Sequence, residues 1–455
     1  MFAKINFHDE FYQKLKLLVL PITMQQFMLA LVSATDAIML GAVSQTSLSA
    51  VSLAGQIQFV LNLFISGISA GSGIMAAQYW GKKDAASIEE VMPIALRTNL
   101  IFSGAFTVFA AVAPEVLMRI FTSDSALIES GAVYLRAVSL SYLLCGISQI
   151  YLILLKNTGY ATVSSRISCT AVVVNIICNA ILIYGLLGLP ALGIQGAAYA
   201  TVAARLVELI WSYLETKQSG RVQIIWKKMF RAADAVLTKD FWRYTTPVLG
   251  AALVWGIAYV SYSVIMGHMG SDAVAANSIT TIAKNMLSCL IRGVSGGAGV
   301  LIGNLLGAGE LDKAKVYGGR LTRMAIVVGM TTGGLLMLIS PLIVRFAPLS
   351  ETAAEYLQYM LIFCGCNIMA QSVNTTVLDG IFCAGGDSKF DMKGNLGAMW
   401  CFSVPFGFFA AFVLKWPVMV VYCIVNLDEI VKIPAVYLHY KKYIWVRNIT
   451  VQEEA

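Results

Sequence analysis

Long apolar runs, separated by short polar segments, follow one another along almost the whole chain. A helix that crosses the hydrocarbon core of a bilayer needs about 20 mostly apolar residues. No run shows the strand-like alternation of a membrane β-barrel. The pattern therefore predicts twelve membrane-spanning helices, near residues 15–40, 50–78, 92–115, 131–155, 163–187, 193–216, 242–267, 275–303, 320–345, 355–382, 395–415 and 417–440.

Composition supports this pattern. Of 455 residues, 58% are hydrophobic and 13% are charged, whereas soluble proteins are roughly 45–50% apolar and about 25% charged. These values exclude a disordered chain, a coiled coil and an ordinary soluble enzyme. The predicted fold class is an all-α polytopic membrane protein.

The charged residues indicate orientation rather than a ligand. The net charge is +7, but the basic residues separate apolar runs instead of forming the clustered face that nucleic acid needs, so we expect no nucleic-acid partner. Most lie in loops of one side, which places both termini in the cytoplasm and the chain in the cell (plasma) membrane as a multi-pass protein. The nine Cys form no C-x-x-C and the three His have no metal spacing, so no metal site is expected.

The two halves of the chain repeat each other. At a shift of 226 residues, Pro21 pairs with Pro247 and Gly71 with Gly297, and after one insertion Pro114 pairs with Pro341. This predicts an N-lobe over residues 1–216, a cytoplasmic linker over 217–241 and a C-lobe over 242–455. Six spans per half give a parallel repeat, with two six-helix lobes related by a pseudo-twofold axis along the membrane normal. Two such lobes with a central cleft are typical of an alternating-access transporter.

Several segments resemble the MATE (multidrug and toxic compound extrusion) family: residues 21–41, "GSGIMAAQYWGKKD" at 71–84, "GIQGAAYAT" at 193–201, "GHMGSDAVAANSI" at 267–279 and "CAGGDSKF" at 383–390. The resemblance covers nearly the whole chain in order and spacing. It implies a secondary antiporter of twelve helices in two lobes that exports organic cations against entering H⁺ or Na⁺. A glycan-lipid flippase of the same superfamily is the near neighbour.

Asp36 is an acid inside the first predicted span, about 7–8 Å from its outer end at about 1.5 Å per residue. A charged side chain within the bilayer costs roughly 2.5–3.5 kcal/mol on insertion scales, so it needs a role or a partner. A desolvated carboxylate can take up a proton near neutral pH, and among neutral oxygens it can hold Na⁺. A carboxylate fixed by neighbouring hydroxyl groups is the alternative. The resemblance identifies Asp36 as the ion-coupling acid of the N-lobe.

The resemblance extends this ion-coupling site to the fifth span, where the family often has Asn-x-x-x-Asp. This chain has Asn175 and Asn179 there, four residues apart on one helix face. The second carboxylate is therefore missing, which weakens the case for Na⁺. By similarity, Gln149 and Thr201 complete the polar pocket. Simple hydrogen bonding between helices is the alternative role of the Asn pair.

Charged residues also lie within the predicted spans of the C-lobe. Lys284 and Asp428 are predicted at similar depth, so Lys284 is a candidate partner of Asp428 or Glu429, and Arg292 is a further intramembrane charge. We favour a structural ion pair, with a proton-linked switch as the alternative. Asp428 with Lys432, and Arg205 with Glu208, also have the spacing to pair within their own helices. The acid that some family members carry eight residues after the seventh-helix proline is Trp255 here, which argues against a Na⁺ site of that kind.

The first helices of the two halves supply a hinge and a substrate surface. Pro21 interrupts backbone hydrogen bonding, so it is either a hinge beside Asp36, as the resemblance implies, or a source of static curvature. Candidate residues of the substrate cleft, which also suit ordinary helix packing, are Met24, Gln25, Met28, Trp255, Tyr259 and Tyr262.

The sequence thus predicts a non-enzymatic exporter of small amphipathic, often cationic compounds, in exchange for H⁺, with Na⁺ as the alternative ion. We expect no cofactor and a monomer in the lipid bilayer. One rival is a lipid-linked oligosaccharide flippase, which would need a large basic cleft for phosphates. The other is an intramembrane enzyme or receptor, for which no catalytic cluster or partner domain is visible.

Overall fold

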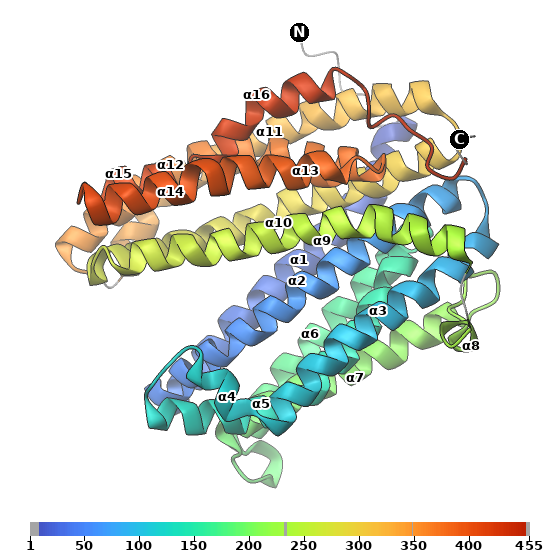
Figure 1. Ribbon diagram of the computed structural model, residues 1–455. Coiled ribbons are helices and arrows are strands. Elements are labelled where there is room, and N and C mark those ends of the chain that lie inside the picture. Colours follow the sequence, from blue (N-terminus) through green and yellow to red (C-terminus); the bar gives the residue numbers. More distant parts are fainter. Residues whose placement is uncertain (1–8, 232–233, 348, 452–455) are drawn as a thin grey trace. The chain divides into compact units, whose positions relative to one another are not determined.

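Helices account for the regular structure of the protein. The structure, a computed structural model, describes residues 9–231, 234–347 and 349–451 and contains no strand within them (Figure 1). Among the described residues, ten helices are long and apolar enough to cross a membrane, which confirms an all-helical membrane fold. Eight of them are single α-helices: Glu10–Val43 (α1), Gln45–Gly81 (α2), Ala85–Val112 (α3), Ser125–Asn157 (α5), Ala161–Tyr184 (α6), Ala235–Gly267 (α9), Ser271–Gly307 (α10) and Leu311–Phe346 (α11). The ninth, Glu351–Phe382, consists of α12 (Glu351–Thr375) and the π-helical Thr376–Phe382. The tenth, Ser388–Val413, consists of α13 (Ser388–Asn395), the π-helical Leu396–Ser403, α14 (Val404–Phe408) and the π-helical Phe409–Val413.

The sixth and twelfth predicted spans take other forms. The sixth is one helix, Gly193–Thr216 (α7), whose charged residues Arg205 and Glu208 lower its mean hydropathy. The twelfth is divided into Val418–Val425 (α15) and Asp428–Tyr440 (α16). The total of twelve spans stays a prediction. Short helical segments complete the chain: Pro114–Arg119 (α4), Leu186–Gly188 and Trp226–Met229 (α8).

The chain folds into two compact units. The N-terminal unit contains Met24–Trp80 and Asp84–Leu249, and the C-terminal unit contains the chain up to Thr23, Gly81–Lys83 and the chain from Gly250 onward. The division passes through α1 after Thr23 and through α9 after Leu249, each two residues beyond the helix proline. These two points are 226 residues apart, which is the shift of the sequence repeat. The lobe boundaries at 216 and 242 stay a prediction.

A hydrophobic core holds the N-terminal unit together. Helix α5 contacts α3 and α7, and α6 contacts α7, so these helices lie side by side (Figure 1). The core joins Leu40 of α1, Leu61 of α2, Leu135 of α5 and Ala198 of α7, and each of these side chains is at most 1% exposed. This core surrounds the part of α1 that carries Asp36.

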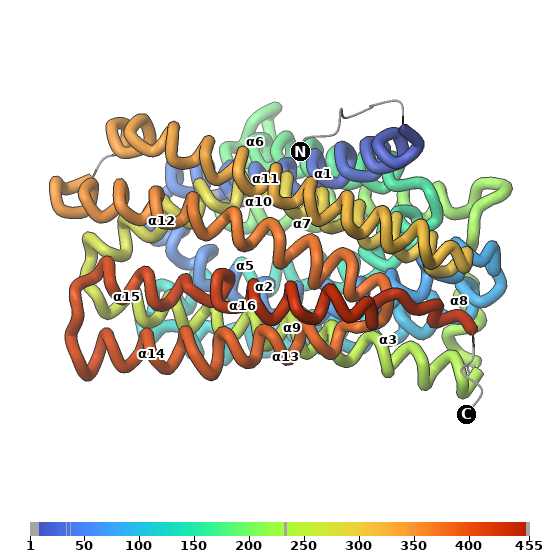
Figure 2. Tube along the Cα trace, turned by 90° about the horizontal axis from the view of Figure 1, so that it is seen from above, coloured from blue at the N-terminus to red at the C-terminus, as the bar shows by residue number. Residues whose placement is uncertain are grey.

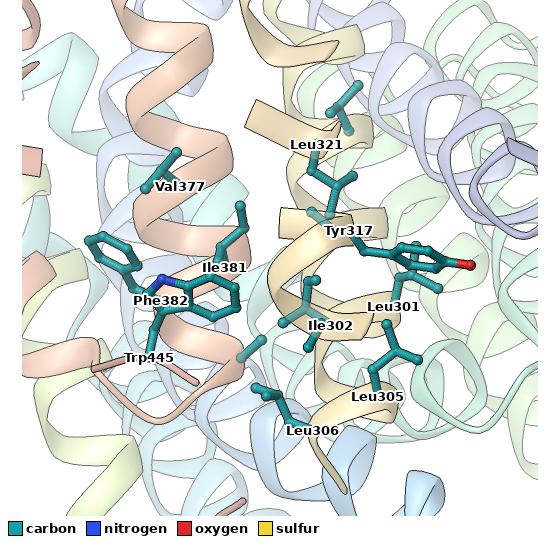
Figure 3. Close-up of a cluster of buried hydrophobic side chains, with 14 of the residues drawn as sticks. Leu301, Ile302, Leu305, Leu306, Tyr317, Leu321, Val377, Ile381, Phe382 and Trp445 are labelled. Carbon is teal, nitrogen blue, oxygen red and sulfur yellow. The ribbon is translucent and has the colours of Figure 1, made fainter. Parts of the chain in front are cut away.

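The largest core of the C-terminal unit joins α10, α11, the end of α12 and the C-terminal segment (Figure 3). Trp445 is fully buried in this core beside Phe382 (Figure 3), and a Cβ atom on Gly318 of α11 would lie 2.7 Å from its ring. Trp445 thus packs the segment after α16 into the fold. Figure 2 shows α13 and α14 running end to end, and α14 contacts α15.

Glycines of α2 allow α9 to approach closely within the N-terminal unit. A Cβ atom on Gly71 would lie 2.6 Å from Cα of Thr245, and one on Gly67 would lie 2.8 Å from Cα of Leu249. Such small residues are typical of closely packed membrane helices. The part of α9 before Gly250 thus packs on α2.

The matching contacts in the C-terminal unit join α10 to α1. A Cβ atom on Gly293 would lie 3.0 Å from the Thr23 backbone nitrogen, and one on Gly297 would lie 2.9 Å from Cγ2 of Val19. All four residues are the repeat counterparts of the α2 and α9 residues, at a shift of 226. The first part of each proline-containing helix therefore packs in the unit formed mainly by the other half of the chain.

Candidate functional site

Asp36 lies at one end of a chain of polar side chains that joins α1, α6 and α7. Its Oδ1 atom accepts a 2.5 Å hydrogen bond from Nδ2 of Asn179, which also donates to Oδ1 of Asn175 at 3.1 Å. Nδ2 of Asn175 reaches Oγ1 of Thr201 at 3.5 Å. The structure therefore brings together four of the five residues predicted for the ion-coupling site.

Helix geometry and burial position these side chains. Asn175 and Asn179 are one helical turn apart on α6, and they are 4% and 0% exposed, while Asp36 is partly buried. The Oδ1 atom of Asn179 is buried and has no hydrogen-bond partner. The site thus contains one carboxylate, a strong amide donor to it and one unused acceptor.

Gln149 does not join this cluster. It lies partly buried on α5, and among the side chains that the structure describes it makes no hydrogen bond to the other four. The neighbour that α5 supplies is Tyr134, which interacts electrostatically with Asp36. The similarity-based role of Gln149 stays a prediction.

A second polar network joins the same three helices closer to Pro21. Nε2 of Gln25 donates to Oγ of Ser168 at 2.8 Å, and Ser168 donates to Oε1 of Glu208 at 3.3 Å. Oε2 of Glu208 accepts from Arg205 at 2.7 Å and from Ser148 at 3.0 Å. The sequence indicates the Arg205–Glu208 pair by its spacing, but nothing in it singles out the two serines.

The C-terminal unit holds a buried charged cluster around Lys432. Its Nζ atom lies 3.0 Å from Oε1 of Glu429, 3.5 Å from Oδ2 of Asp428 and 3.1 Å from Oδ1 of Asn395. Asn395 in turn donates to Asp391 at 3.0 Å. Because Lys432 and Asp428 are each 5% exposed, the paired charges are largely shielded from solvent.

This arrangement differs from the predicted pair of Lys284 with Asp428 or Glu429. Among the ion pairs of the described residues, both acids contact Lys432, which lies one turn away on their own helix. Lys284 is partly buried and Arg292 is exposed. Lys284 interacts electrostatically with both acids without forming a direct ion pair to either among the described residues, so its role as their partner stays a prediction.

The helix is broken between α15 and α16. The carbonyl of Asn426 accepts a hydrogen bond from Asn367 of α12, and Asn374 donates to Oε2 of Glu429 at 2.8 Å. Asn367 thus satisfies a backbone carbonyl that a continuous helix would have satisfied itself. Irregular backbone at this depth in a membrane protein needs such partners.

The predicted substrate residues are distributed over both units. Met24, Gln25 and Met28 belong to the N-terminal unit, whereas Trp255, Tyr259 and Tyr262 belong to the C-terminal unit. Trp255 and Tyr259 stack with their ring centres 5.5 Å apart. Tyr259 also lines a hollow of ≈ 320 Å³ with Ser263, Met266, Gly267, Val274, Asn277, Ser278, Thr281 and Ile282. A shared role of the six residues stays a prediction.

Pro21 lies inside a continuous helix. Helix α1 runs from Glu10 to Val43 without interruption, just as α9 continues through Pro247. The unit boundary after Thr23 follows Pro21 closely. A hinge at Pro21 would therefore separate the two parts of α1 that pack in different units.

The cluster at Asp36 is suited to binding one proton or one small cation. The described residues contain no group of three or more His, Cys, Asp or Glu side chains that could hold a metal ion. A single carboxylate beside amide groups can instead exchange a proton and change the hydrogen bonds that join three helices.

Comparison with known proteins agrees with this description. The sequence model of the MatE family matches residues 21–181 and 247–409. Both matches begin at a proline, Pro21 or Pro247, and are separated by the shift of the internal repeat. The family resemblance predicted from the sequence is thereby confirmed.

Curated relatives include named transporters, and a solved transporter structure shares the fold. The uncharacterized transporter YisQ of Bacillus subtilis is 22% identical, with 91% of this chain and 90% of the relative covered. The probable multidrug resistance protein NorM of Agrobacterium fabrum is 24% identical, with 76% and 73% covered. A MOP superfamily transporter from Pyrococcus furiosus has a TM-score of 0.86 at 18% identity, with 95% of each chain covered, which shows a common fold.

Proposed function

The chain belongs to the MATE family of transporters, and from this premise we propose that it exports amphipathic, often cationic compounds in exchange for H⁺ that binds Asp36. The observation that carries the proposal is the hydrogen bond from Asn179 to Asp36, which ties α1 to α6 through a titratable group. The relatives described as probable multidrug resistance proteins support this substrate class.

The chemistry of the cluster favours H⁺ over Na⁺. Hard cations prefer several oxygen ligands, often with more than one carboxylate. Here Asp36 is the carboxylate of the cluster, and the Asn175 amide oxygen already accepts from Asn179. A proton needs only one carboxylate oxygen and one acceptor, which the unpartnered Oδ1 of Asn179 supplies once the amide turns.

In the proposed cycle, a proton from outside neutralises Asp36 while substrate occupies the protein. A neutral acid makes a weaker hydrogen bond than a carboxylate, so the tie between α1 and α6 loosens. The part of α1 beyond Pro21 then shifts, and substrate leaves outward. Release of the proton to the cytoplasm restores the bond to Asn179 and resets the transporter.

The remaining parts of the proposal concern the setting of the protein. We place it in the plasma membrane as a monomer with both termini in the cytoplasm, because basic residues favour that side. The terminal residues themselves lie outside the described ranges. No cofactor enters the cycle, since the ion gradient supplies the free energy.

The test uses purified protein in liposomes with a cationic dye, under an imposed pH gradient and then under a Na⁺ gradient. We expect the pH gradient to drive dye movement, and Asp36→Asn to abolish this dependence because an amide at that position cannot take up the proton. Glu115→Gln is the control, because it removes an exposed acid of the same unit that pairs with Arg136. It should transport as the unchanged protein does.

Two outcomes would contradict the proposal. If Asp36→Asn transports with an unchanged dependence on the pH gradient, Asp36 is not the coupling group. If neither gradient moves dye although the protein is folded, the lipid-linked oligosaccharide flippase becomes the better hypothesis, and fluorescent lipid-linked sugars replace the dye. If only the Na⁺ gradient drives dye movement, the proposed export function stands, but the coupling ion is Na⁺ rather than H⁺.

A further inference from the structure

Two of the hydrogen bonds that join α1 to α6 share one constant register. Gln25 contacts Ser168, and Asp36 contacts Asn179, with a sequence separation of 143 residues in both pairs. The two contacts lie eleven residues apart on each helix. Eleven residues are about three helical turns, so both contacts use the same face of each helix.

The contact closer to Pro21 is supported by a buried ion pair. Ser168 accepts from Gln25 and donates to Glu208, and Glu208 is only 1% exposed. Arg205 and Ser148 bind the other carboxylate oxygen of Glu208. The hydroxyl of Ser168 is therefore fixed by its donor and its acceptor, which makes it an oriented attachment point for α1.

We propose that Ser168, held by Glu208, is a positioning residue that anchors α1 through Gln25 and thereby sets the pH at which α1 leaves α6. The proposal rests on the proposed function, in which Asp36 takes up the proton. When the Asp36–Asn179 contact weakens, the Gln25–Ser168 contact still opposes movement of α1, together with the hydrogen bond from Tyr184 to the Met39 carbonyl. The strength of the Gln25–Ser168 contact then contributes to how low the pH must fall before α1 moves.

The direction of the effect follows from linkage. Protons favour the state in which α1 has moved, because only the charged form of Asp36 gains the full bond from Asn179. Removing the Gln25–Ser168 contact favours the same state at every pH. Fewer protons are then needed, so the midpoint of the movement shifts to higher pH, by about 0.5–1 pH unit for a three- to tenfold change in the equilibrium.

The surroundings contain few other groups that could cause the pH dependence. From α5, Tyr134 interacts electrostatically with Asp36. From α6, Tyr184 donates to the carbonyl of Met39 on α1 at 3.0 Å. Helix α7 presents Arg205 and Glu208, which bind each other, and α2 contains no Asp, Glu, Lys, Arg or His.

The experiment measures the position of α1 directly. Spin labels are attached through ketone-bearing residues at positions 38 and 177, because Ile38 of α1 and Ile177 of α6 are exposed, at 73% and 53%. This chemistry leaves the nine native cysteines in place. The distance between the labels is followed from pH 5 to 8 in lipid nanodiscs, without substrate.

Variants are chosen to remove one contact at a time. Ser168→Ala and Gln25→Met each remove the contact and should each raise the midpoint by about 0.5–1 pH unit, while the double variant should show no further shift. Ser168→Thr keeps the hydroxyl and should restore the original midpoint. Ser148→Ala is the matched control, since it removes a donor to Glu208 without touching α1.

The outcomes separate this proposal from the proposed function. If the unchanged protein shows a pH-dependent distance and the variants leave its midpoint in place, the anchoring role of Ser168 is wrong. Additive shifts in the double variant, or an equal shift in Ser148→Ala, would overturn it as well. If the distance in the unchanged protein does not depend on pH, the proton-coupled role of Asp36 fails, and the anchoring proposal fails with it.

Discussion

The close approach of α9 to α2 yields a prediction about Gly71→Ala. The added Cβ atom would lie 2.4 Å from Oγ1, 2.7 Å from Cβ and 2.6 Å from Cα of Thr245. The side chain of Thr245 cannot relieve this overlap by rotating, because Cα belongs to the backbone. Helix α9 must therefore move away from α2 by about 0.8 Å before the contact reaches the 3.4 Å of ordinary packing.

The expected cost follows from overpacking. Extra atoms forced into a packed interior typically destabilise by about 1–3 kcal/mol. Gly55→Ala, on the same helix, is the control, because no atom lies within 4 Å of its added Cβ. That variant should be neutral or gain up to about 1 kcal/mol from the better helix propensity of alanine.

Thermal unfolding of both variants in the same detergent measures this difference. A change of 1 kcal/mol shifts the midpoint by about 2–4 °C for a unit of 150–250 residues. We therefore expect Gly71→Ala to unfold several degrees below the unchanged protein, and Gly55→Ala at or slightly above it. Equal midpoints for both alanine variants would refute the close contact of α2 and α9.

The repeat counterpart offers an internal check. A Cβ atom on Gly297 would meet Cγ2 of Val19 at 2.9 Å, which is the end of a side chain. Gly297→Ala should thus cost less than Gly71→Ala, and Val19→Ala should restore its stability in the double variant. No truncation of the Thr245 side chain should rescue Gly71→Ala, because the backbone causes that overlap.

Two further predictions concern charged groups of the C-terminal unit. Lys432→Met removes the ion-pair partner of the buried Asp428 and of the partly buried Glu429 and should destabilise by about 3–5 kcal/mol in thermal unfolding, whereas Lys284→Met, which removes a partly buried lysine, should cost much less. The backbone N–H of Phe11 and the guanidinium of Arg320 hold the pKa of Asp9 below its usual range, so its stabilising effect is present above about pH 4 and is lost as pH falls further. Asp9→Asn should remove this loss below about pH 4; an unchanged pH profile would contradict it.

The helices could be predicted from the sequence because the bilayer imposes a length and an apolar composition on each of them. The predicted runs agree with the helices of the structure, although many helices begin several residues earlier. The break after Val425 could not be predicted. It depends on Asn367, which lies 59 residues before Asn426 in the sequence and binds its carbonyl only in the folded chain.

The candidate site could be predicted in part for a similar reason. A lone acid in a span is conspicuous, and Asn175 with Asn179 has the spacing of one helix face. Ser168 is an ordinary residue of a membrane helix, and only the folded structure shows that it connects Gln25 to Glu208. In the C-terminal unit, the sequence indicates Lys284 by its depth and Lys432 by its spacing, and only the folded structure shows that Lys432 makes the direct ion pairs.

Because the two halves of the chain repeat each other, charged residues at matching positions can be compared. Arg205 and Lys432 are 227 residues apart, which is the shift of the repeat in this part of the chain, and both are cations on the last helix of their half. Each binds an acid three residues away on its own helix, Glu208 or Glu429. A buried cation with a nearby acid is therefore a property of the common scaffold.

Asp36 has no such counterpart, because the matching position of the C-terminal half is Tyr262. It also has no cation beside it among the described residues, only the amide of Asn179. A paired acid is held in one charge state by its partner, whereas an acid bound only by an amide can gain and lose a proton without leaving a cation unpaired. The unpaired acid thus lies on α1, one of the two helices that continue from one unit into the other. This is why we expect the proton to act on α1, and the paired charges of α7 and α16 to hold their helices in place.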